Sequence, residues 1–198
     1  MYRPLIVAAF TVALSAHSYA QEPGLPLYPA KLGTKWYYRV MPPKGEIYEV
    51  ITEVTKSEFK QGRWFVTLKH TGPTSSTDEL VIAVDGVYLV GSNGMPFPKP
   101  IQILRVGAKP NESWTIKTGE RLDEVEMIGT YTATETTVFP AGTFKTHKVK
   151  LEVKPARGGS QIIHYWYAEG VGPVAQIYYD VKTDKSTRFE LMKYEPGK

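Results

Sequence analysis

Apolar and polar residues alternate with a period of two along most of the chain after residue 33. The clearest stretch covers residues 146–154, where odd positions are mostly apolar and even positions are mostly charged. Trp64, Val66 and Leu68 share a face by the same test. Because successive side chains of a strand point to opposite faces, this pattern predicts strands with one buried and one solvated face. No segment shows the periodicity of a helix.

Turn residues interrupt this alternation at the spacing of about 8–12 residues that is typical of antiparallel sheet proteins. We therefore predict an all-β fold. It is built either as a single strongly curved antiparallel sheet, in the form of a half-barrel, or as a two-sheet sandwich. The predicted strands cover residues 34–41, 46–56, 62–70, 79–84, 87–91, 100–105, 112–117, 122–136, 144–154, 160–168, 174–182 and 186–194.

Two glycine turns and a proline-rich segment define the connections. Asp85-Gly86 lies between two apolar runs, which predicts a hairpin turn with positive φ at both residues, and Gly158-Gly159 is suited to the same role. Residues 95–100 contain three prolines, which cannot donate to a sheet ladder. This segment is therefore predicted to be an extended crossover rather than a central strand.

The two sides of that crossover resemble each other. Residues 32–37 match 106–115, and residues 83–87 match 168–171, each at an offset of about 80 residues. An internal duplication is one explanation of these matches, and chance similarity within an aromatic-rich meander is the other. The halves would cover residues 28–93 and 101–194.

Residues 1–20 predict a secretory signal peptide. Arg3 precedes an apolar run over residues 5–14, and small residues stand at Ser18 and Ala20, the positions that a signal peptidase reads. An uncleaved anchor is the alternative, but the run is shorter than the roughly 20 residues of a membrane span. We predict a single β domain over residues 21–198, periplasmic or secreted, with no membrane span after cleavage. The chain has no cysteine, so it has no disulfide and no lipidated N-terminal cysteine.

Composition narrows the class further. Hydrophobic residues make up 42% and charged residues 22%, close to globular averages, which argues against disorder and against a polytopic membrane protein. The net charge is +4 and falls by one when the leader is removed. Because the basic residues are scattered, a nucleic-acid partner is not expected.

Motifs of metal sites, serine nucleophiles and phosphate-binding loops do not occur, so we expect no cofactor, no metal and no catalytic residue. If Gly158-Gly159 turns the chain, His147 and His164 lie roughly 13–20 Å apart and cannot share an ion. Both have the apolar parity of their strands, which predicts hydrogen-bonded inward histidines; whether they or His70 have a functional role stays open. A pair of carboxylates about 5–9.5 Å apart would suit a glycan hydrolase, yet most acids here alternate with apolar residues, as on a solvated face.

Large aromatic side chains fall on both faces of several strands. A curved sheet with such side chains on its concave face forms an apolar trough or cavity suited to lipids or other apolar ligands. The alternative is a well-filled sandwich whose tyrosines cover its edges. The predicted ligand-binding residues are Trp36, Tyr38, Trp64, Trp114 and Trp166.

Three segments carry a resemblance to a known family. They are LGTKW (32–36), VFPAGTFKTHKV (138–149) and YWYAEGVGPV (165–174). Together they resemble exported, largely uncharacterised bacterial β proteins of the TapB-like kind. The resemblance implies an exported antiparallel sheet protein, with a half-barrel architecture similar to LolA-type lipoprotein carriers, and it carries over no catalytic residue. Independently of it, Pro140 and Gly142 predict a rigid corner between two strands.

Three functions remain open. The first is an exported non-enzymatic binding protein that holds an apolar or lipid-like ligand on an aromatic-lined concave sheet face. The second is an envelope interaction module that docks another protein through its edge strands. The third is a carboxylate-dependent hydrolase of glycans.

Overall fold

The structure, a computed structural model, describes residues 27–119 and 124–198. Within these ranges all regular structure is antiparallel β-strand, and no helix occurs. The predicted leader, residues 1–20, lies outside the described residues. The strands are β1 (Lys35–Met41), β2 (Tyr48–Lys60), β3 (Arg63–Thr71), β4 (Ser75–Ala83), β5 (Gly86–Ser92), β6 (Met95–Arg105), β7 (Ser113–Thr118), β8 (Val125–Phe139), β9 (Gly142–Pro155), β10 (Gln161–Ala168), β11 (Gly172–Asp180) and β12 (Lys185–Glu195).

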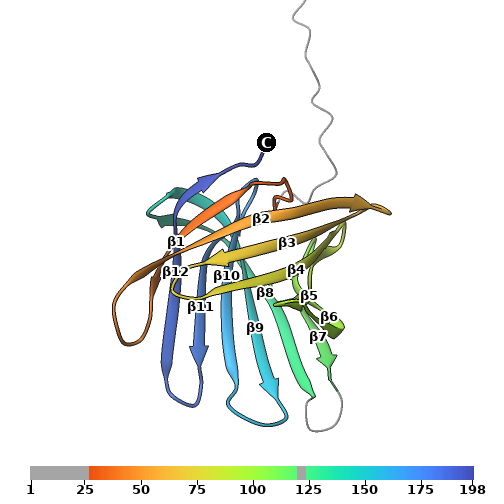
Figure 1. The fold of residues 1–198 in the computed structure, drawn as a ribbon. Helices are drawn as coiled ribbons and strands as arrows, with labels where there is room; N and C mark the ends of the chain where they lie inside the picture. The colour runs from red at the N-terminus through yellow and green to blue at the C-terminus, as the bar shows by residue number, and fades with distance from the viewer. Residues whose placement is uncertain (1–26, 120–123) are drawn as a thin grey trace, which may run out of the picture.

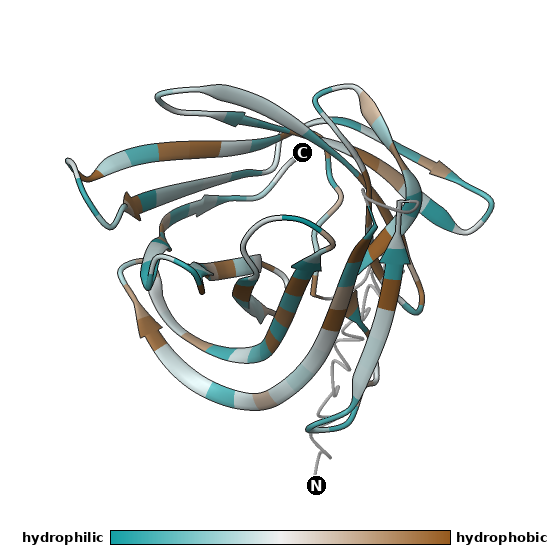
Figure 2. Cartoon of the chain, turned by 90° about the horizontal axis from the view of Figure 1, so that it is seen from below, coloured by the Kyte–Doolittle hydropathy of each residue, from teal (hydrophilic) through white to brown (hydrophobic). Residues whose placement is uncertain are grey.

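The strands form one sheet in the order β6-β5-β4-β3-β2-β1-β12-β11-β10-β9-β8-β7. In Figure 1, β2 to β4 run across the direction of β9 to β12, and Figure 2 shows the sheet curling into an almost closed ring. The all-β fold and the single curved sheet are therefore confirmed, and the two-sheet alternative does not apply. The curvature exceeds that of a half-barrel, since the sheet forms a nearly closed barrel.

A side chain, rather than a backbone ladder, joins the two edges of the sheet. Trp114 of β7 donates a hydrogen bond from Nε1 to the carbonyl oxygen of Gln102 in β6, at 2.9 Å. The guanidinium of Arg105 lies 5.3 Å from the centre of the same ring. Trp114 also lies directly opposite Gly129 of β8, where a Cβ atom would clash with the indole. The missing side chain of Gly129 thus lets the indole lie flat and reach across the gap between β6 and β7.

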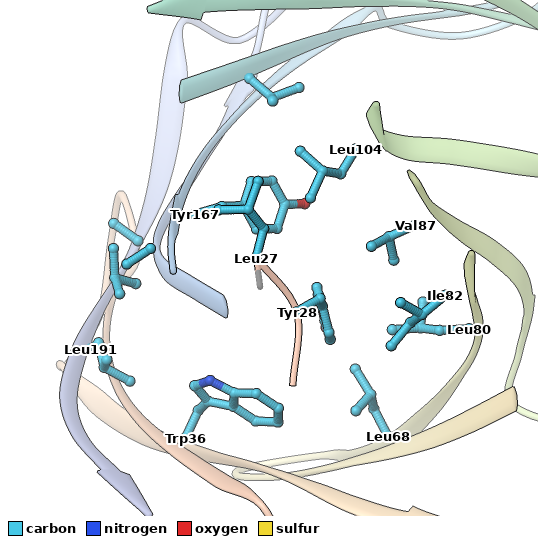
Figure 3. Close-up of a cluster of buried hydrophobic side chains, with 14 of the residues drawn as sticks. Leu27, Tyr28, Trp36, Leu68, Leu80, Ile82, Val87, Leu104, Tyr167 and Leu191 are labelled. Atoms are coloured by element: carbon cyan, nitrogen blue, oxygen red, sulfur yellow. The ribbon is translucent and has the colours of Figure 1, made fainter. Parts of the chain in front are cut away.

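The segment before β1 enters the barrel and contributes to its core. Leu27 and Tyr28 lie in the middle of the buried cluster, surrounded by side chains from several strands (Figure 3). The Tyr28 ring centre is 6.1 Å from that of Trp36 and 6.3 Å from that of Tyr167. The carbonyl oxygen of Ala30 accepts a hydrogen bond from Ser57. Part of the barrel interior is thus filled by this segment instead of by strand side chains.

The predicted turn at Asp85-Gly86 is displaced by one residue. Ala83 pairs with Gly86, so the loop residues are Val84 and Asp85, and neither Asp85 nor Gly86 has a positive φ. A Cβ atom at position 86 would clash with the carbonyl oxygen of Leu104 on β6. Glycine is required here by close contact between neighbouring strands and not by the turn.

The proline-rich segment is part of a hairpin, so its prediction as a crossover was wrong. Asn93 and Gly94, with φ of 52° and 74°, form the tight turn between β5 and β6. Met95 and Pro96 then pair back onto Ser92 and Gly91 of β5, and after an irregularity over residues 97–100 the pairing resumes with Ile101 opposite Leu89. The prolines are tolerated because β6 is an edge strand, where missing amide donors break no ladder.

The tip of the β8–β9 hairpin reaches β12 and packs against the core, with Phe139 in the buried cluster and Phe144 against it. Its loop, Pro140-Ala141, reaches β12, where the amide of Ala141 donates to the carbonyl oxygen of Leu191 at 3.0 Å. The tip lies beside the upper part of β12 in Figure 1. The predicted corner between two strands is thus confirmed as a hairpin turn.

The strand order is compatible with two six-stranded meanders. Trp36 lies in β1 and Trp114 in β7, while residues 83–87 and 168–171 cover the β4–β5 and β10–β11 turns. Each matched pair therefore lies six strands apart. The duplication itself stays a prediction.

Candidate functional site

A cavity of about 290 Å³ opens into the barrel between β1, β2, the β3–β4 loop and β11–β12. A smaller chamber of about 100 Å³ lies against it and extends inward to Tyr28, Trp36 and Tyr167. The two spaces share lining residues from five strands, which makes them parts of one site. The shared residues are Tyr38, Thr52, His70, Asp78, Gln176 and Tyr178.

Aromatic rings form one side of this site. Phe189 meets Tyr38 and Tyr178 edge to face, with ring centres 6.5 Å and 5.5 Å apart. Tyr178 in turn meets Tyr165 in the same manner at 6.4 Å, and Tyr165 stacks on Tyr167 at 5.6 Å. Edge-to-face pairs fix each ring in orientation, so the lining is rigid and presents both ring faces and ring edges.

A chain of hydrogen bonds forms the other side. Thr52 and His70 are opposite each other in the β2–β3 ladder, and their side chains approach to 2.9 Å between Oγ1 and Nδ1. The other ring nitrogen, Nε2, lies 3.2 Å from Oδ2 of Asp78 on β4. This geometry suits a neutral imidazole that accepts from the Thr52 hydroxyl and donates Nε2–H to the carboxylate. The three side chains are thereby held in one arrangement.

The local electrostatics keep Asp78 ionised. Burial on its own would raise the pKa of this carboxyl group, but hydrogen bonds from His70 and Ser92 and the charge of His70 outweigh it, so the pKa is lowered. Burial raises the pKa of Tyr178, and the nearby Asp78 charge acts in the same direction. Burial likewise raises the pKa of Tyr38 well above its ordinary value. The tyrosines are therefore neutral hydroxyls around one carboxylate.

The Tyr167 hydroxyl is buried and has no hydrogen-bond partner among the described residues. Its side chain is 0% exposed and lines the inner chamber, and Figure 3 shows its oxygen directed into the enclosed space. An unpaired buried hydroxyl costs about 1–3 kcal/mol. A polar atom that occupied the inner chamber would remove this cost.

The lowered pKa of Asp78 predicts a contribution to acid stability. A carboxyl group whose pKa is depressed in the folded state stabilises the protein above its ordinary pKa of 3.8, and this stabilisation is lost as the pH falls through the folded value. We expect Asp78→Asn to lose less unfolding free energy than the original protein between about pH 5 and pH 2. Urea unfolding at several pH values measures the difference.

Other groups with lowered pKa values, such as Glu152 and Glu195, are present in both proteins and therefore cancel in the difference. The charge-matched change Glu79→Gln, one residue further along β4, is the control and should leave the pH dependence close to that of the original protein. Parallel pH profiles for the original protein and Asp78→Asn would contradict the prediction.

The structure brings two of the five predicted ligand residues to the site. Tyr38 lines both spaces, and Trp36 lines the inner chamber. Trp64 shares the inward face of its strand but packs against Phe59, with ring centres 5.1 Å apart, away from the cavity. Trp114 is buried at the junction of β6 and β7.

Trp166 lies on the outer face. Its indole donates to Glu135 at 2.6 Å, and the ammonium group of Lys148 is 4.7 Å from the ring centre. The aromatic run 165–167 gave no local indication of which ring points inward, and the structure places Tyr165 and Tyr167 inside. The placement of Trp166 in the lining is not supported by this geometry.

The predicted histidine orientations are half right. His147 faces inward, opposite Tyr167, with Nδ1 3.0 Å from the Tyr131 hydroxyl. His164 was predicted to be inward, but it shares the outer face with Trp166, with ring centres 6.0 Å apart. The register explains the error, because Tyr165 and Tyr167 take the inward positions of β10.

Sequence reasoning missed the polar half of the site. Asp78 has the parity of Leu80 and Ile82, which are buried, so a carboxylate at an inward position was detectable in principle. The predicted strand began at residue 79 and left Asp78 outside it. Tyr48, Tyr178 and Phe189 were also missed, because no local signal distinguishes a lining ring from a core ring.

A second hollow, of about 280 Å³, lies on the outer side of β3 to β6 and is lined by Val81, Val90 and Pro100 among others. Among the described residues, no three histidine, aspartate or glutamate side chains are placed to hold a metal ion. The same part of the chain contains no helix long and apolar enough to cross a membrane.

The fold is similar to those of two solved bacterial structures. One is a predicted lipoprotein of Parabacteroides distasonis, with a TM-score of 0.59 and 16% identity over 87% of this chain and 99% of the other. The second is a predicted exported protein with a YmcC-like fold from Bacteroides fragilis, with a TM-score of 0.60 and 15% identity over the same shares. No family model and no curated protein matches the chain.

These likenesses establish a shared fold. That fold occurs in exported bacterial β proteins, in agreement with the broader part of the predicted resemblance. The comparisons do not name the TapB-like or LolA-type families, so the narrower resemblance stays a prediction.

Proposed function

We propose that this chain is an exported, non-enzymatic binding protein that holds one small amphiphilic ligand inside its barrel. The observation that carries the proposal is the cavity with an aromatic side and a polar side. Two observations are in line with this role. The sequence predicts export by a signal peptide, and the two solved structures of similar fold are of exported proteins.

The size of the cavity favours a small ligand. Its volume of about 290 Å³ is at the lower end of the roughly 300–1,000 Å³ of small-molecule pockets. The inner chamber adds room for a single polar group near the Tyr167 hydroxyl. A cavity of this size is too small for a whole multi-chain lipid, so the ligand is smaller than the lipid-like molecule that the aromatic content alone indicated.

The lining favours an amphiphilic molecule over a wholly apolar one. Apolar surface placed against Tyr38, Tyr178 and Phe189 gains about 25 cal/mol per Å² removed from water. A wholly apolar ligand, however, would remove the solvent-exposed part of the Asp78 carboxylate from water without offering it a polar group, which is costly. A ligand with one apolar and one polar end satisfies both sides.

The alternatives have less support. The hydrolase needs two facing carboxylates, and Asp78 is the one carboxylate among the described residues that line this cavity. Docking by strand addition needs an accessible edge, whereas β6 and β7 face each other across the Trp114 hydrogen bond.

Filling the cavity tests the proposal. Ser76 lines the cavity opposite His70, and we expect Ser76→Phe to occupy part of the space and to weaken ligand retention about tenfold or more. Native mass spectrometry of protein purified from its exported form, followed by solvent extraction, measures the bound small molecule.

The matched control is Ser75→Phe. Ser75 is the preceding residue of β4, exposed on the opposite face, so the same substitution leaves the cavity open. Equal retention by the two variants, or no small molecule bound to the original protein, would contradict the proposal.

A further inference from the structure

The outer cavity has the construction of a cage for a positively charged group. Four aromatic side chains, from β1, β2, β11 and β12, surround it: Tyr38, Tyr48, Tyr178 and Phe189. The contacts of Phe189 with Tyr38 and Tyr178 are both near perpendicular, at 78° and 64°. Rings set at right angles present their negative faces from more than one direction, and aromatic faces attract cations.

Apart from the His70 imidazole, the charge of the lining has one sign. Asp78 is the one carboxylate among the described lining residues, and no lysine or arginine is among them. His70 is the remaining ionisable side chain apart from the tyrosines, and its position between Thr52 and Asp78 suits the neutral imidazole that donates Nε2–H. The site therefore carries a net charge of minus one when His70 is neutral.

This negative charge is only partly balanced by its surroundings. The Asp78 carboxylate accepts hydrogen bonds from His70 and Ser92, but its side chain keeps 33% of its surface exposed. The charge of Asp78 also acts on Tyr28 and Tyr178, adding to the burial that raises the pKa of each. A bound cation would meet an attractive potential here, and an anion would meet a repulsive one.

We propose that the ligand of this site carries an organic ammonium group, held over the aromatic rings and facing Asp78. This inference rests on the proposed function, because it names the ligand class of the same cavity. The apolar remainder of the ligand lies along Phe189 and Val50, both of which line the opening.

Three probes of similar size and different charge test the inference. The first is choline, and the second is neohexanol (3,3-dimethylbutan-1-ol), in which carbon replaces the charged nitrogen. The third is the anion 3,3-dimethylbutanoate. We expect choline to bind about tenfold or more tightly than neohexanol, and the anion to bind most weakly. Isothermal titration calorimetry, supported by chemical shifts of the tyrosine rings, measures all three on the original protein.

Asp78→Asn tests the source of the preference. We expect this variant to bind choline about tenfold more weakly while neohexanol binding stays unchanged, so that the ratio of the two affinities approaches one. Glu79→Gln makes the same charge change one residue away, outside the cavity lining, and should keep the preference.

The outcomes separate this inference from the proposed function. Equal binding of choline and neohexanol, or no binding of choline, overturns the inference even where native mass spectrometry shows another bound molecule. The proposed function then still stands, and it falls if Ser76→Phe and Ser75→Phe retain the bound molecule equally or if the original protein holds no small molecule. Because the probe comparison uses the original protein, it does not depend on the folding of any variant.

Discussion

Replacing Trp36 by alanine is expected to lower the free energy of unfolding by about 3–5 kcal/mol. The Trp36 side chain is 1% exposed and lies between Tyr28 and Tyr194, with ring centres 6.1 Å and 5.9 Å away. Its Nε1 donates to the carbonyl oxygen of Val171 at 2.6 Å, which ties β1 to the β10–β11 turn. The substitution removes this bond and leaves a void in the barrel.

Urea unfolding followed by circular dichroism measures this loss. Trp64→Ala is the control, because Trp64 is only partly buried and packs near the end of the β2–β3 hairpin, so we expect less than about half the effect. Trp36→Phe keeps a ring but leaves the Val171 carbonyl unpaired, and should cost about 1–3 kcal/mol. A loss below about 1 kcal/mol for Trp36→Ala would show that this residue does not anchor the core.

Removing the Trp114 side chain is expected to open the junction between the sheet edges. Trp114 is 4% exposed, and its hydrogen bond to Gln102 crosses from β7 to β6. We expect Trp114→Ala to lower the unfolding free energy by about 3–5 kcal/mol. Amide hydrogen exchange in β5 to β8 should also accelerate more than exchange in β10 to β12, because local opening begins where the ladder is interrupted.

Two further variants test this interpretation. Gly129→Ala keeps the indole but places a methyl group against it, so we expect the same local pattern of exchange with a smaller cost of about 1–3 kcal/mol. Trp166→Ala, on the outer face, should leave exchange in β6 and β7 unchanged. Uniform acceleration along the whole sheet in Trp114→Ala would mean that this residue supports the core in general and does not close the barrel.

Much of the fold was predictable because each strand shows a local alternation of apolar and polar residues in the sequence. Each of the twelve predicted strands corresponds to an observed strand, with ends that move by a few residues. The alternation over 146–154 and the shared face of Trp64, Val66 and Leu68 appear in the structure as buried and solvated sides of β9 and β3. The prediction of a crossover over residues 95–100 failed. Asn93-Gly94 carried the signal of a tight turn, but the prediction rested only on the three prolines that follow.

The site was less predictable because it is the space that the inward side chains leave unfilled, and the sequence does not show where that space lies. Trp36 and Tyr38 were identified as inward rings, yet Trp114 has the same aromatic character and serves in the sheet junction instead. Bulges change the parity along a strand, as at Val174 of β11, where Trp166 pairs with Ala175 and Tyr167 with Pro173, so local alternation does not carry through such a position. The contact between His70 and Asp78 depends on the pairing of β3 with β4 and is not visible in either segment alone.

The sequence by itself determined that this protein is all-β, which segments are strands, and which residue types are available to line an interior. These properties follow from the two-residue period of side chains, which is local to each strand. Only the tertiary structure decided that the sheet nearly closes, that Leu27 and Tyr28 enter its core, and that four aromatic rings and Asp78 share one cavity. Those features arise from contacts between residues distant in the chain, whose relative positions are set by sheet twist, bulges and edge contacts.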